Sequence, residues 1–501
     1  MVRIWARRTS RVTARANTSD LPRAVPNYVR DVVAARPGAE RALITLAADG
    51  TRTEWTFAAL LDAAARLAGH LRARGIGRGS VIMTLLGNRI EYPLTMLACL
   101  HLGAAMLPCS EQLRAKDLAL RLASARPDLV LCDERNRAEL DAAAPPCPVL
   151  FVPGEFDGQA PPYAELDERD PAFVLFTSGT SGAPKLVLHG QRYVHGQHLQ
   201  AATWMAAEPG ELVWSTAAPG WSKSARNGFL APWLCGATAL LQDRRFDPAE
   251  RLATVRAEGV NVLCMAPTEY RLIAAHGPIE DVPTLRRLIT AGEALGVPAL
   301  TAWREQTGLT IADGYGQTET GHVTGVRRGE QAPPGSMGRP LSGVRAEIVD
   351  GELCLDPATV PTFFLGYDGE PARDGLWHTG DRVHADADGW LFFESRADDV
   401  IVSAGYRIGP AEVESTLLGH PAVREVAVIG EPDDARGQLV VAVVVLRDGH
   451  EPCAELERDL QDFVKAETAP YKYPRRVRFV AELPKTTSGK IHRAALRTTG
   501  S

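Results

Sequence analysis

Apolar and polar positions alternate along the first three fifths of the chain with two periods, one typical of helices and one of strands. Residues 57–74 carry apolar side chains at helical spacing, whereas residues 80–86 form a short apolar run typical of a buried strand. The same pattern continues as helices over 92–102 and 117–125, strands over 104–108 and 129–132, and further alternation within 235–270 and 285–312. Such alternation indicates parallel βαβ units. We therefore expect an α/β fold whose large N-terminal domain contains several subdomains with sheets rich in parallel strands.

The pattern changes beyond residues 396–399, a charged segment that lies between two apolar runs. The following residues predict helices over 410–418 and 456–465 and strands over 423–430 and 439–446. We expect a small, mobile α+β lid domain there. The predicted division of the chain is 1–24 for an N-terminal tail, 25–396 for the large domain and 397–501 for the lid.

Composition narrows the classes of function that the chain can have. A length of 501 residues exceeds what one core holds, and 23% charged with 45% hydrophobic residues is ordinary for a soluble protein. A net charge of −6 gives no reason to propose nucleic acid as a partner, and no apolar run reaches the ~18 residues of a membrane span. The eight cysteines are scattered, which favours reduced thiols over disulfides or zinc ligands. We expect a cytoplasmic monomer or homodimer without a membrane partner.

The N-terminal segment is strongly basic. Five arginines precede the first acidic residue, Asp20, as in a mitochondrial transit peptide. The rest of the chain is also rich in alanine, arginine and glycine, as a GC-rich bacterial gene would encode. We favour a disordered basic tail over residues 1–24, with a targeting segment as the alternative.

The most informative chemistry lies in residues 176–190, Phe-Thr-Ser-Gly-Thr-Ser-Gly-Ala-Pro-Lys-Leu-Val-Leu-His-Gly. A strand-like run opens into residues that are almost all glycine, serine or threonine, followed by Pro184 and Lys185. Consecutive amide groups in such a segment form a nest for anions, and the lysine adds a positive charge. The combination suits a polyphosphate, although the spacing is not that of the usual P-loop. A Ser/Gly-rich surface turn is the alternative interpretation of this segment alone.

Three later segments extend the pattern in a fixed order. They are Asp-Gly-Tyr-Gly-Gln-Thr-Glu-Thr-Gly at 313–321, His-Thr-Gly-Asp at 378–381 with Ser-Arg-Ala-Asp-Asp at 395–399, and Pro-Lys-Thr-Thr-Ser-Gly-Lys at 484–490. Together with 176–190 they resemble the adenylate-forming superfamily of acyl-CoA synthetases, peptide-synthetase adenylation domains and luciferases. Segments 217–224, 403–415 and 468–475 are most similar to medium-chain acyl-CoA synthetases, and the resemblance covers about residues 25–497.

This resemblance implies an AMP-forming acid:CoA ligase that uses ATP, Mg²⁺ and CoA. The enzyme would activate a medium-chain, aromatic or polar carboxylic acid as an acyl-adenylate and transfer the acyl group to CoA. One alternative is an adenylate-forming enzyme of a biosynthetic pathway, which uses an unusual acid or passes the acyl group to a carrier protein or an amine. A degenerate ATP-binding scaffold is the non-enzymatic alternative, but the intact Lys185, Glu319, Asp381 and Lys490 argue against it.

The resemblance also implies a set of catalytic and nucleotide-binding residues. Thr318 would contact the α-phosphate, Glu319 would hold Mg²⁺, and Lys490 would bridge the substrate carboxylate and the α-phosphate, with Lys185 near the β,γ-phosphates. The phosphate loop, the adenine pocket and the ribose pair would comprise Thr177, Ser178, Gly179, Thr180, Ser181, Gly182, Gly292, Glu293, Asp313, Gly314, Tyr315, Gln317, Asp381 and Arg396. Tyr315 would stack on the base, and Asp381 would accept hydrogen bonds from both ribose hydroxyls.

The lid would rotate about Asp398, withdrawing Lys490 after adenylation and opening a tunnel for the pantetheine arm of CoA. The positions that match CoA-contacting residues of the subgroup are Gly405, Tyr406, Arg407, Arg436, Lys465, Tyr473 and Arg475. Basic side chains there suit a ligand with three phosphate groups.

The acyl pocket would involve Trp221, Arg226 and Gly316. Gly316 occupies a position where acetate-specific relatives carry tryptophan, which implies space for acids longer than acetate. Arg226 falls where the subgroup tends to have an aromatic residue. Its side chain either faces the substrate or, as the alternative, pairs with an acid or points to solvent. We interpret His189 and His322 as structural or pocket-wall residues, since a carboxylate is already ionised at neutral pH and needs no general base.

Overall fold

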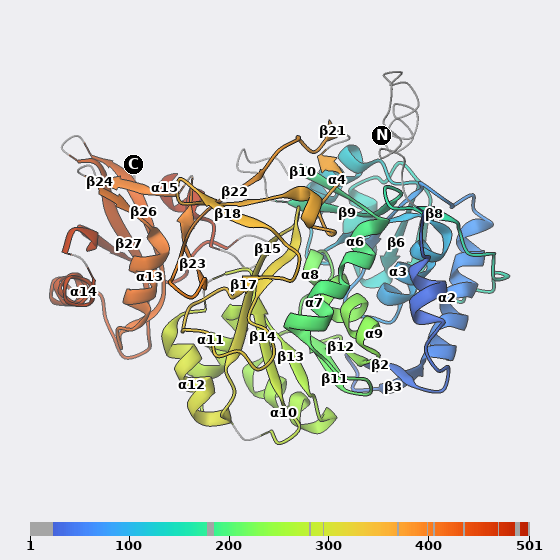
Figure 1. Cartoon of the computed structure of the whole chain (residues 1–501), viewed down its shortest axis with the longest axis horizontal. Coiled ribbons are helices and arrows are strands. Elements are labelled where there is room, and N and C mark those ends of the chain that lie inside the picture. The colour runs from blue at the N-terminus through green and yellow to red at the C-terminus, as the bar shows by residue number, and fades with distance from the viewer. Residues whose placement is uncertain are drawn as a thin grey trace.

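The computed structural model describes residues 24–177, 185–279, 282–293, 295–367, 370–397, 399–403, 406–433, 436–468, 470–485 and 491–498. Within these ranges the chain builds two large sheets rich in parallel strands first, then a four-stranded antiparallel sheet, and finally a five-stranded sheet at one end of the molecule (Figure 1). The expected α/β class, with a large N-terminal and a small C-terminal part, is confirmed. The exact division at residues 396 and 397 remains a prediction.

The first large sheet has the strand order β21-β20-β10-β9-β5-β4-β6-β7. Its strands are β4 (Val81–Leu85), β5 (Ala105–Cys109), β6 (Leu129–Asp133), β7 (Val149–Val152), β9 (Pro171–Thr177), β10 (Lys185–Gly190), β20 (Gly366–Tyr367) and β21 (Glu370–Pro371). Strands β9, β5, β4, β6 and β7 are parallel, whereas β10 turns back antiparallel to β9. Strands β4, β5 and β6 are buried throughout, as expected for parallel strands covered on both faces.

The second large sheet has the order β17-β16-β15-β14-β13-β11-β12-β2-β3. Its strands are β2 (Arg41–Leu46), β3 (Arg52–Thr56), β11 (Leu212–Ser215), β12 (Thr238–Gln242), β13 (Val262–Cys264), β14 (Arg287–Ala291), β15 (Ile311–Gln317), β16 (Gly321–Gly325) and β17 (Arg339–Pro340). The central strands from β2 to β15 are parallel, and β16 returns antiparallel to β15 as a hairpin. This hairpin carries most of segment 313–321.

An antiparallel sheet of order β18-β19-β22-β23 connects the large sheets to the C-terminal part. It consists of β18 (Ala346–Val349), β19 (Glu352–Leu355), β22 (Trp377–Ala385) and β23 (Leu391–Arg396). The C-terminal sheet contains β24 (Ile401–Ser403), β25 (Tyr406–Ile408), β26 (Val423–Asp433), β27 (Gly437–Leu446) and β28 (Arg476–Phe479). A short pair, β1 (Ala24–Val25) with β8 (Leu166–Asp167), joins the start of the described chain to the region before β9.

The helices begin and end at the residues that their sequences favour. Helix α2 is capped by the Thr56 hydroxyl, which accepts a hydrogen bond from the backbone N–H of Ala59 at 3.2 Å, and its buried face repeats at helical spacing. The others are α3 (Glu91–Leu102), α4 (Ala115–Ala125), α5 (Arg137–Ala142), α6 (Gln191–Gly196), α7 (His198–Gln200), α8 (Ser222–Ala225), α9 (Ala231–Cys235), α10 (Pro248–Glu258), α11 (Pro267–His276), α12 (Val297–Thr307), α13 (Pro410–Leu418), α14 (Ala454–Glu467) and α15 (Arg493–Thr498), and α2 itself spans Phe57–Arg72. No helix in the described ranges has both the length and the apolar surface that a membrane span needs.

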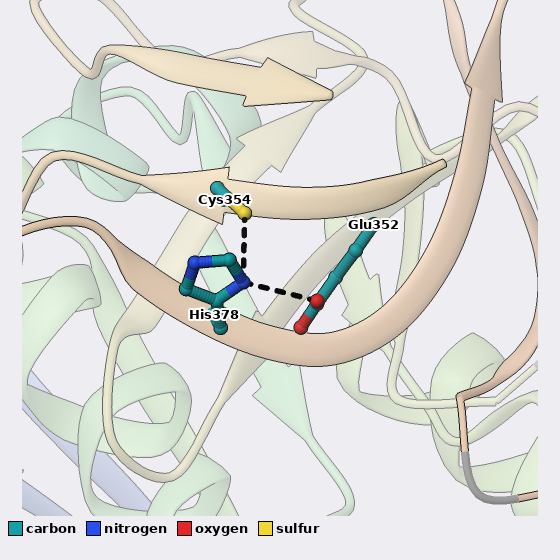
Figure 2. Close-up of side chains that lie close together, drawn as sticks. All are labelled: Glu352, Cys354 and His378. Carbon is teal, nitrogen blue, oxygen red and sulfur yellow. Dashed lines mark hydrogen bonds and ion pairs between the residues drawn. The ribbon is translucent and has the colours of Figure 1, made fainter. Parts of the chain in front are cut away.

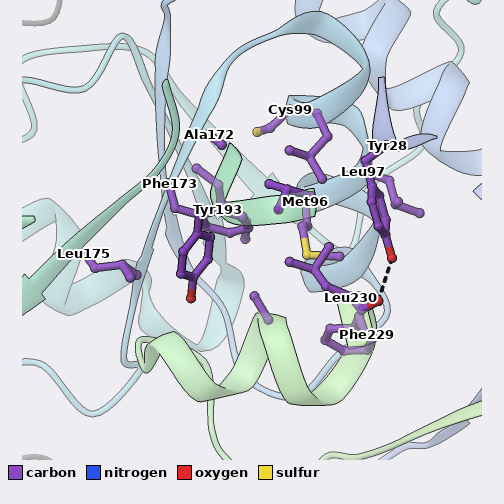
Figure 3. Close-up of a cluster of buried hydrophobic side chains, with 14 of the residues drawn as sticks. Tyr28, Met96, Leu97, Cys99, Ala172, Phe173, Leu175, Tyr193, Phe229 and Leu230 are labelled. Atoms are coloured by element: carbon purple, nitrogen blue, oxygen red, sulfur yellow. Dashed lines mark hydrogen bonds between the residues drawn. The ribbon is translucent and has the colours of Figure 1, made fainter. Parts of the chain in front are cut away.

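One buried cluster joins the two large sheets (Figure 3). Met96 and Leu97 of α3 lie in it beside Phe173 of β9 and Tyr193 of α6. The same cluster contains Phe229 and Leu230, which belong to a π-helical turn, Arg226–Leu230, between α8 and α9. The Tyr28 hydroxyl donates to the Leu230 carbonyl at 2.8 Å. The segment that carries Arg226 is therefore anchored from both sides by packed side chains.

Candidate active site

The two ends of the predicted phosphate loop lie next to each other. Thr177 ends β9 and Lys185 begins β10, and the two residues are opposite partners in the antiparallel ladder. The intervening positions of the prediction, Ser178, Gly179, Thr180, Ser181 and Gly182, lie outside the described residues.

Lys185 and Glu319 approach each other through a tyrosine that the motifs did not reveal. The Lys185 ammonium lies 5.3 Å from the ring centre of Tyr367, and the Tyr367 hydroxyl donates to Oε1 of Glu319 at 2.6 Å. Burial and the neighbouring carboxylate raise the pKa of Tyr367, so the hydroxyl keeps its proton and donates. Tyr367 is on β20, which pairs with β10. Only this pairing, invisible in the sequence, places it between the two predicted residues.

The turn that connects β15 to β16 holds Thr318 and Glu319. His189 of β10 lies against it, with Nε2 2.7 Å from the Thr318 carbonyl oxygen. Because burial lowers the pKa of His189 to about 3, the ring is neutral and Nε2 carries the proton that it donates. The Glu319 carbonyl accepts from the backbone N–H of Phe364 at 2.8 Å. The backbone of the turn is therefore fixed from two sides.

Asp381 lies at the centre of a buried hydrogen-bond network that joins two predicted motifs. Its Oδ2 accepts from the Tyr315 hydroxyl and from Nε2 of Gln317 at 2.9 Å. Its Oδ1 accepts from Nη1 of Arg396 at 3.0 Å, across the β22–β23 ladder. The side chains predicted to contact the ribose and the adenine thus meet in one place, although Asp381 is only 4% exposed.

A second group of side chains fixes the turn that presents Asp381 (Figure 2). Oε1 of Glu352 accepts from the backbone N–H of Gly380 at 2.7 Å, and its Oε2 lies 3.0 Å from Nδ1 of His378. The Cys354 thiol lies 3.4 Å from the same nitrogen. Glu352, Cys354 and His378 are residue types that can hold zinc, and their ligand atoms lie within 4.8 Å of one another. Here the carboxylate is already bound to the turn, so the group serves to position Asp381.

The predicted adenine-pocket residues follow two neighbouring parallel strands. Gly292 and Glu293 come directly after β14, and Asp313 and Gly314 lie on β15 beside it. Glu293 accepts from the backbone N–H of Thr268 at 2.9 Å, which holds it at the start of α11. Burial raises the pKa of Asp313 to about 8. The carboxyl ends of adjacent parallel strands are a common place for ligand sites, and the predicted residues gather there.

Gly316 lies close to the backbone of the neighbouring strand. A Cβ atom built on Gly316 would lie 1.9 Å from the Gly321 carbonyl oxygen, beside a register shift of the β15–β16 ladder between Tyr315 and Gly316. The backbone approach of β16 therefore requires a glycine here, and the space for acids longer than acetate stays a prediction.

The remaining acyl-pocket residues lie on one continuous helical segment. Trp221 precedes α8 and is partly buried, and Arg226 begins the π-helical turn and is 3% exposed. Because Arg226 is buried, its guanidinium does not point to solvent. His189 and His322 are both buried, and the charge of Arg226 contributes to lowering the pKa of each ring.

The predicted CoA-contacting residues lie in the C-terminal part. Lys465 and Arg475 both place their cationic groups over the Tyr473 ring, at 4.3 and 4.0 Å from its centre. Tyr406 is 51% exposed and stacks on Tyr471 with ring centres 4.3 Å apart. Arg436 follows β26, where its backbone N–H donates to Asp433 at 2.9 Å. Asp398, Gly405, the Arg407 side chain and Lys490 lie outside the described residues.

Comparison with known proteins identifies relatives of the whole chain. The family model described as AMP-binding enzyme matches residues 30–365, and that described as AMP-binding enzyme C-terminal domain matches residues 412–490. An uncharacterized acyl-CoA ligase, YtcI of Bacillus subtilis (strain 168), is 36% identical over 494 residues, which cover 92% of this chain and 93% of the relative. The human mitochondrial acyl-coenzyme A synthetase ACSM4 is 35% identical over 491 residues, covering 89% of this chain and 84% of the relative.

A solved structure shows the same arrangement. The anthranilate CoA ligase AuaEII, in complex with anthranoyl-AMP, has a TM-score of 0.88 to this chain at 26% sequence identity. The superposition covers 97% of this chain and 99% of that enzyme.

Proposed function

The chain belongs to the AMP-binding enzyme family, and from this premise we propose that it is an AMP-forming acid:CoA ligase. In the first half-reaction a carboxylate oxygen attacks the α-phosphate of ATP, forming acyl-AMP and releasing pyrophosphate. In the second, the CoA thiol attacks the acyl carbon, the thioester forms and AMP leaves. The observation that carries the proposal is the network around Asp381, which joins Tyr315, Gln317 and Arg396 beside the turn of Thr318 and Glu319.

The nucleotide-binding roles follow from what each side chain offers. Asp381 is an acceptor buried among donors, and its Oδ1 has a free lone pair for a ribose hydroxyl. Accepting both ribose hydroxyls requires Tyr315 or Gln317 to release Oδ2 on binding. Thr318 offers a hydroxyl at the turn, and Lys185 offers a positive charge at the start of β10. We assign the phosphates of ATP to this edge, with Thr177 and residues 178–182 completing the loop around them.

Glu319 fits the role proposed for it in holding Mg²⁺. Its Oε1 accepts from Tyr367, which leaves Oε2 as an oxygen ligand, and hard divalent cations prefer a small number of carboxylates together with phosphate oxygens. When bound, Mg²⁺ would neutralise charge on the phosphates. Tyr367 orients the carboxylate and is a residue that we add to the site.

The C-terminal part would act as a lid that serves both half-reactions. Lys490 would bridge the carboxylate and the α-phosphate during adenylation, and rotation about Asp398 would then bring Gly405 and Tyr406 toward the site. The cluster of Lys465, Tyr473 and Arg475 supports a binding surface for the phosphates of CoA, because two cationic groups lie over one ring. Arg407 and Arg436 complete the proposed CoA-contacting set. We further propose a cytoplasmic enzyme, monomeric or homodimeric, that acts on a small carboxylic acid.

The identity of the acyl acceptor distinguishes this proposal from its alternative, in which a carrier protein or an amine receives the acyl group. The test measures AMP release with a panel of acids, with and without CoA, beside ATP–pyrophosphate exchange. We expect exchange that depends on the acid and needs no CoA, and sustained AMP release only when CoA is present. Exchange without any CoA-dependent release would favour the alternative acceptor, and no exchange with any acid would contradict adenylation itself.

A further inference from the structure

Arg226 is a buried cation without a protein partner in the described part of the chain. The residue is 3% exposed, and its Nε and Nη1 atoms are fully buried without a hydrogen bond. The titratable groups that act on it electrostatically are the Tyr193 hydroxyl and the Cys264 thiol, and no described carboxylate is among them. The other buried arginine among the described residues, Arg251, differs, since it pairs with Glu269 at 2.8 Å. An unpaired charge at such a position is costly unless something else supplies the counter-charge.

Several further polar atoms around Arg226 also lack a partner among the described residues. They are the Tyr193 hydroxyl, Oδ1 of Asn227, Nδ1 of His189 and both ring nitrogens of His322. Figure 3 shows the Tyr193 hydroxyl directed toward the helical segment that carries Phe229 and Leu230, next along the chain from Arg226. Buried polar atoms are normally paired, so a concentration of unpaired ones marks a place that a polar ligand completes. Beside them Gly228 is buried, yet a Cβ built there would meet no atom within 4 Å.

This group of residues lies immediately behind the proposed α-phosphate residue. The His189 ring contacts Tyr193 in a tilted arrangement with ring centres 4.0 Å apart, and His189 donates to the Thr318 carbonyl at 2.7 Å. On the other side, the His322 ring would lie 2.4 Å from a Cβ on Gly314, so it packs directly on β15. The reacting carboxylate must meet the α-phosphate at Thr318. From Thr318, the contacts through His189 and Tyr193 lead to Arg226.

We propose that the acid activated by this enzyme carries a second anionic oxygen group, a carboxylate being the simplest, which binds the Arg226 guanidinium. The proposal rests on the function proposed above, and it deepens that function by naming the substrate class. Arg226 supplies the charge, Tyr193 supplies a hydroxyl donor, and His322 supplies one N–H. A plain alkyl chain would bury these groups against carbon, and it would leave the guanidinium without a counter-charge.

The charge states of the residues around Arg226 favour an anionic ligand group over a cationic one. Burial lowers the pKa of His189 to about 3, and burial together with Arg226 and Lys223 lowers that of His322 well below its usual value. Both rings are therefore neutral at physiological pH, so the charge that faces this space is the guanidinium of Arg226. Asn227 faces the Cys264 side of the segment, with Nδ2 3.5 Å from the thiol.

The test compares acids matched in length that differ in the second group. The aliphatic pairs are hexanoate with adipate and octanoate with suberate, and the aromatic pair is benzoate with isophthalate. CoA-dependent AMP release gives kcat/KM for each. For the wild type we expect the diacid of at least one pair to exceed its matched monoacid by about 100-fold or more, because it completes a buried charge pair. The aliphatic and aromatic pairs distinguish which carbon skeleton carries the second group.

The variant Arg226→Met keeps the length of the side chain and removes its charge. It should reverse the preference within the favoured pair and leave the Kd for ATP unchanged. Because no described acid depends on Arg226, the variant leaves no orphaned carboxylate and should unfold at no lower temperature than the wild type. The matched control is Arg304→Met, an exposed arginine of α12, which should keep the wild-type ratios. A nonhydrolysable ATP analogue alone should raise the unfolding temperature of both proteins equally, and adding the favoured diacid should raise it further for the wild type and not for Arg226→Met.

The outcomes separate the two proposals. A wild type that turns over the monoacid of every pair better than the diacid, or an Arg226→Met variant with unchanged ratios, would overturn the second anionic group and leave the ligase function standing. Absence of CoA-dependent AMP release with every acid would overturn the ligase function, and this inference with it.

Discussion

Asp313 offers a measurable pH dependence of stability. Burial raises the pKa of its carboxyl to about 8, and the Glu293 carboxylate adds to this effect, while the Gly314 N–H and Lys223 oppose it. In the unfolded chain the same group titrates near its ordinary value of about 4. The folded protein therefore holds this proton more tightly, and the stability that depends on the protonated group is lost as the pH rises from about 4 to about 8.

Asp313→Asn should remove this loss of stability at higher pH, because the amide side chain has no charge to bury. The difference in unfolding temperature, variant minus wild type, should increase between about pH 5 and about pH 8.5, as measured by thermal unfolding at each pH. Asp388→Asn is the control, since Asp388 lies in the exposed turn between β22 and β23 and should give no such trend. A difference that stays constant with pH would show that Asp313 is ionised in the folded protein.

Asp381→Asn tests the ribose site. Asp381 accepts from Tyr315, Gln317 and Arg396, and an amide offers one acceptor oxygen where the carboxylate offers two. We expect the KM for ATP to rise by about 10- to 100-fold, since the charged acceptor is lost, with a smaller change in the KM for the acid. Asp388→Asn, in the exposed turn between β22 and β23, is the control. An unchanged KM for ATP would place the ribose elsewhere.

At the scale of elements, the β15–β16 hairpin requires glycine where its strands approach other backbone. A Cβ on Gly316 would overlap the Gly321 carbonyl. Gly321 itself has a φ of +68°, and a Cβ built on it would lie 2.7 Å from the Thr362 side chain. Gly316→Ala should therefore lower the free energy of unfolding by about 3 kcal/mol or more, measured by urea denaturation. Gly77→Ala, where a Cβ would meet nothing within 4 Å, is the matched control.

The expected effect of Gly316→Ala on activity differs from the effect of filling an open pocket. If Gly316→Ala folded with wild-type stability and only shifted preference toward shorter acids, the hairpin would have room that the structure does not show. The expected result is loss of stability together with reduced activity on every acid, because the turn with Thr318 and Glu319 moves with the hairpin.

The elements that the sequence predicted are those with a strong local signal. Helix α2 has a capping threonine and a full apolar face, and the prediction of 57–74 agrees with the observed Phe57–Arg72. The sites predicted by motif, such as Asp381 with Arg396, also meet in the structure. What the sequence could not show depends on contacts between distant segments. Tyr367 reaches Glu319 only because β20 pairs with β10, and the burial of Arg226 depends on helices and strands from both large sheets.

At the scale of the whole molecule, the C-terminal part lies at one end, beside the antiparallel sheet (Figure 1). Helix α13 packs near β23, where a Cβ on Gly409 would lie 2.8 Å from the Glu394 carbonyl oxygen. Arg493 of α15 binds Glu414 at 2.7 Å through Nη2 and also lies within electrostatic range of Glu293 in the proposed adenine pocket. Arg493, at the start of α15, is thus close enough to a proposed adenine-pocket residue to interact with it electrostatically. This interaction supports a lid that meets the nucleotide-binding residues in the first half-reaction.

Lys490→Ala should therefore separate the two half-reactions. Without the ammonium that stabilises charge between the carboxylate and the α-phosphate, acid-dependent ATP–pyrophosphate exchange should fall by about 100- to 1,000-fold. Thioester formation from CoA and the synthetic acyl-adenylate should stay within about threefold of the wild type, since the rotated lid no longer uses this lysine. Lys485→Ala is the matched control, because Lys485 pairs with Glu425 at 2.7 Å within the C-terminal part and should affect neither half-reaction. Equal losses in both half-reactions of Lys490→Ala would contradict the rotating lid, and they would assign Lys490 a role common to both conformations.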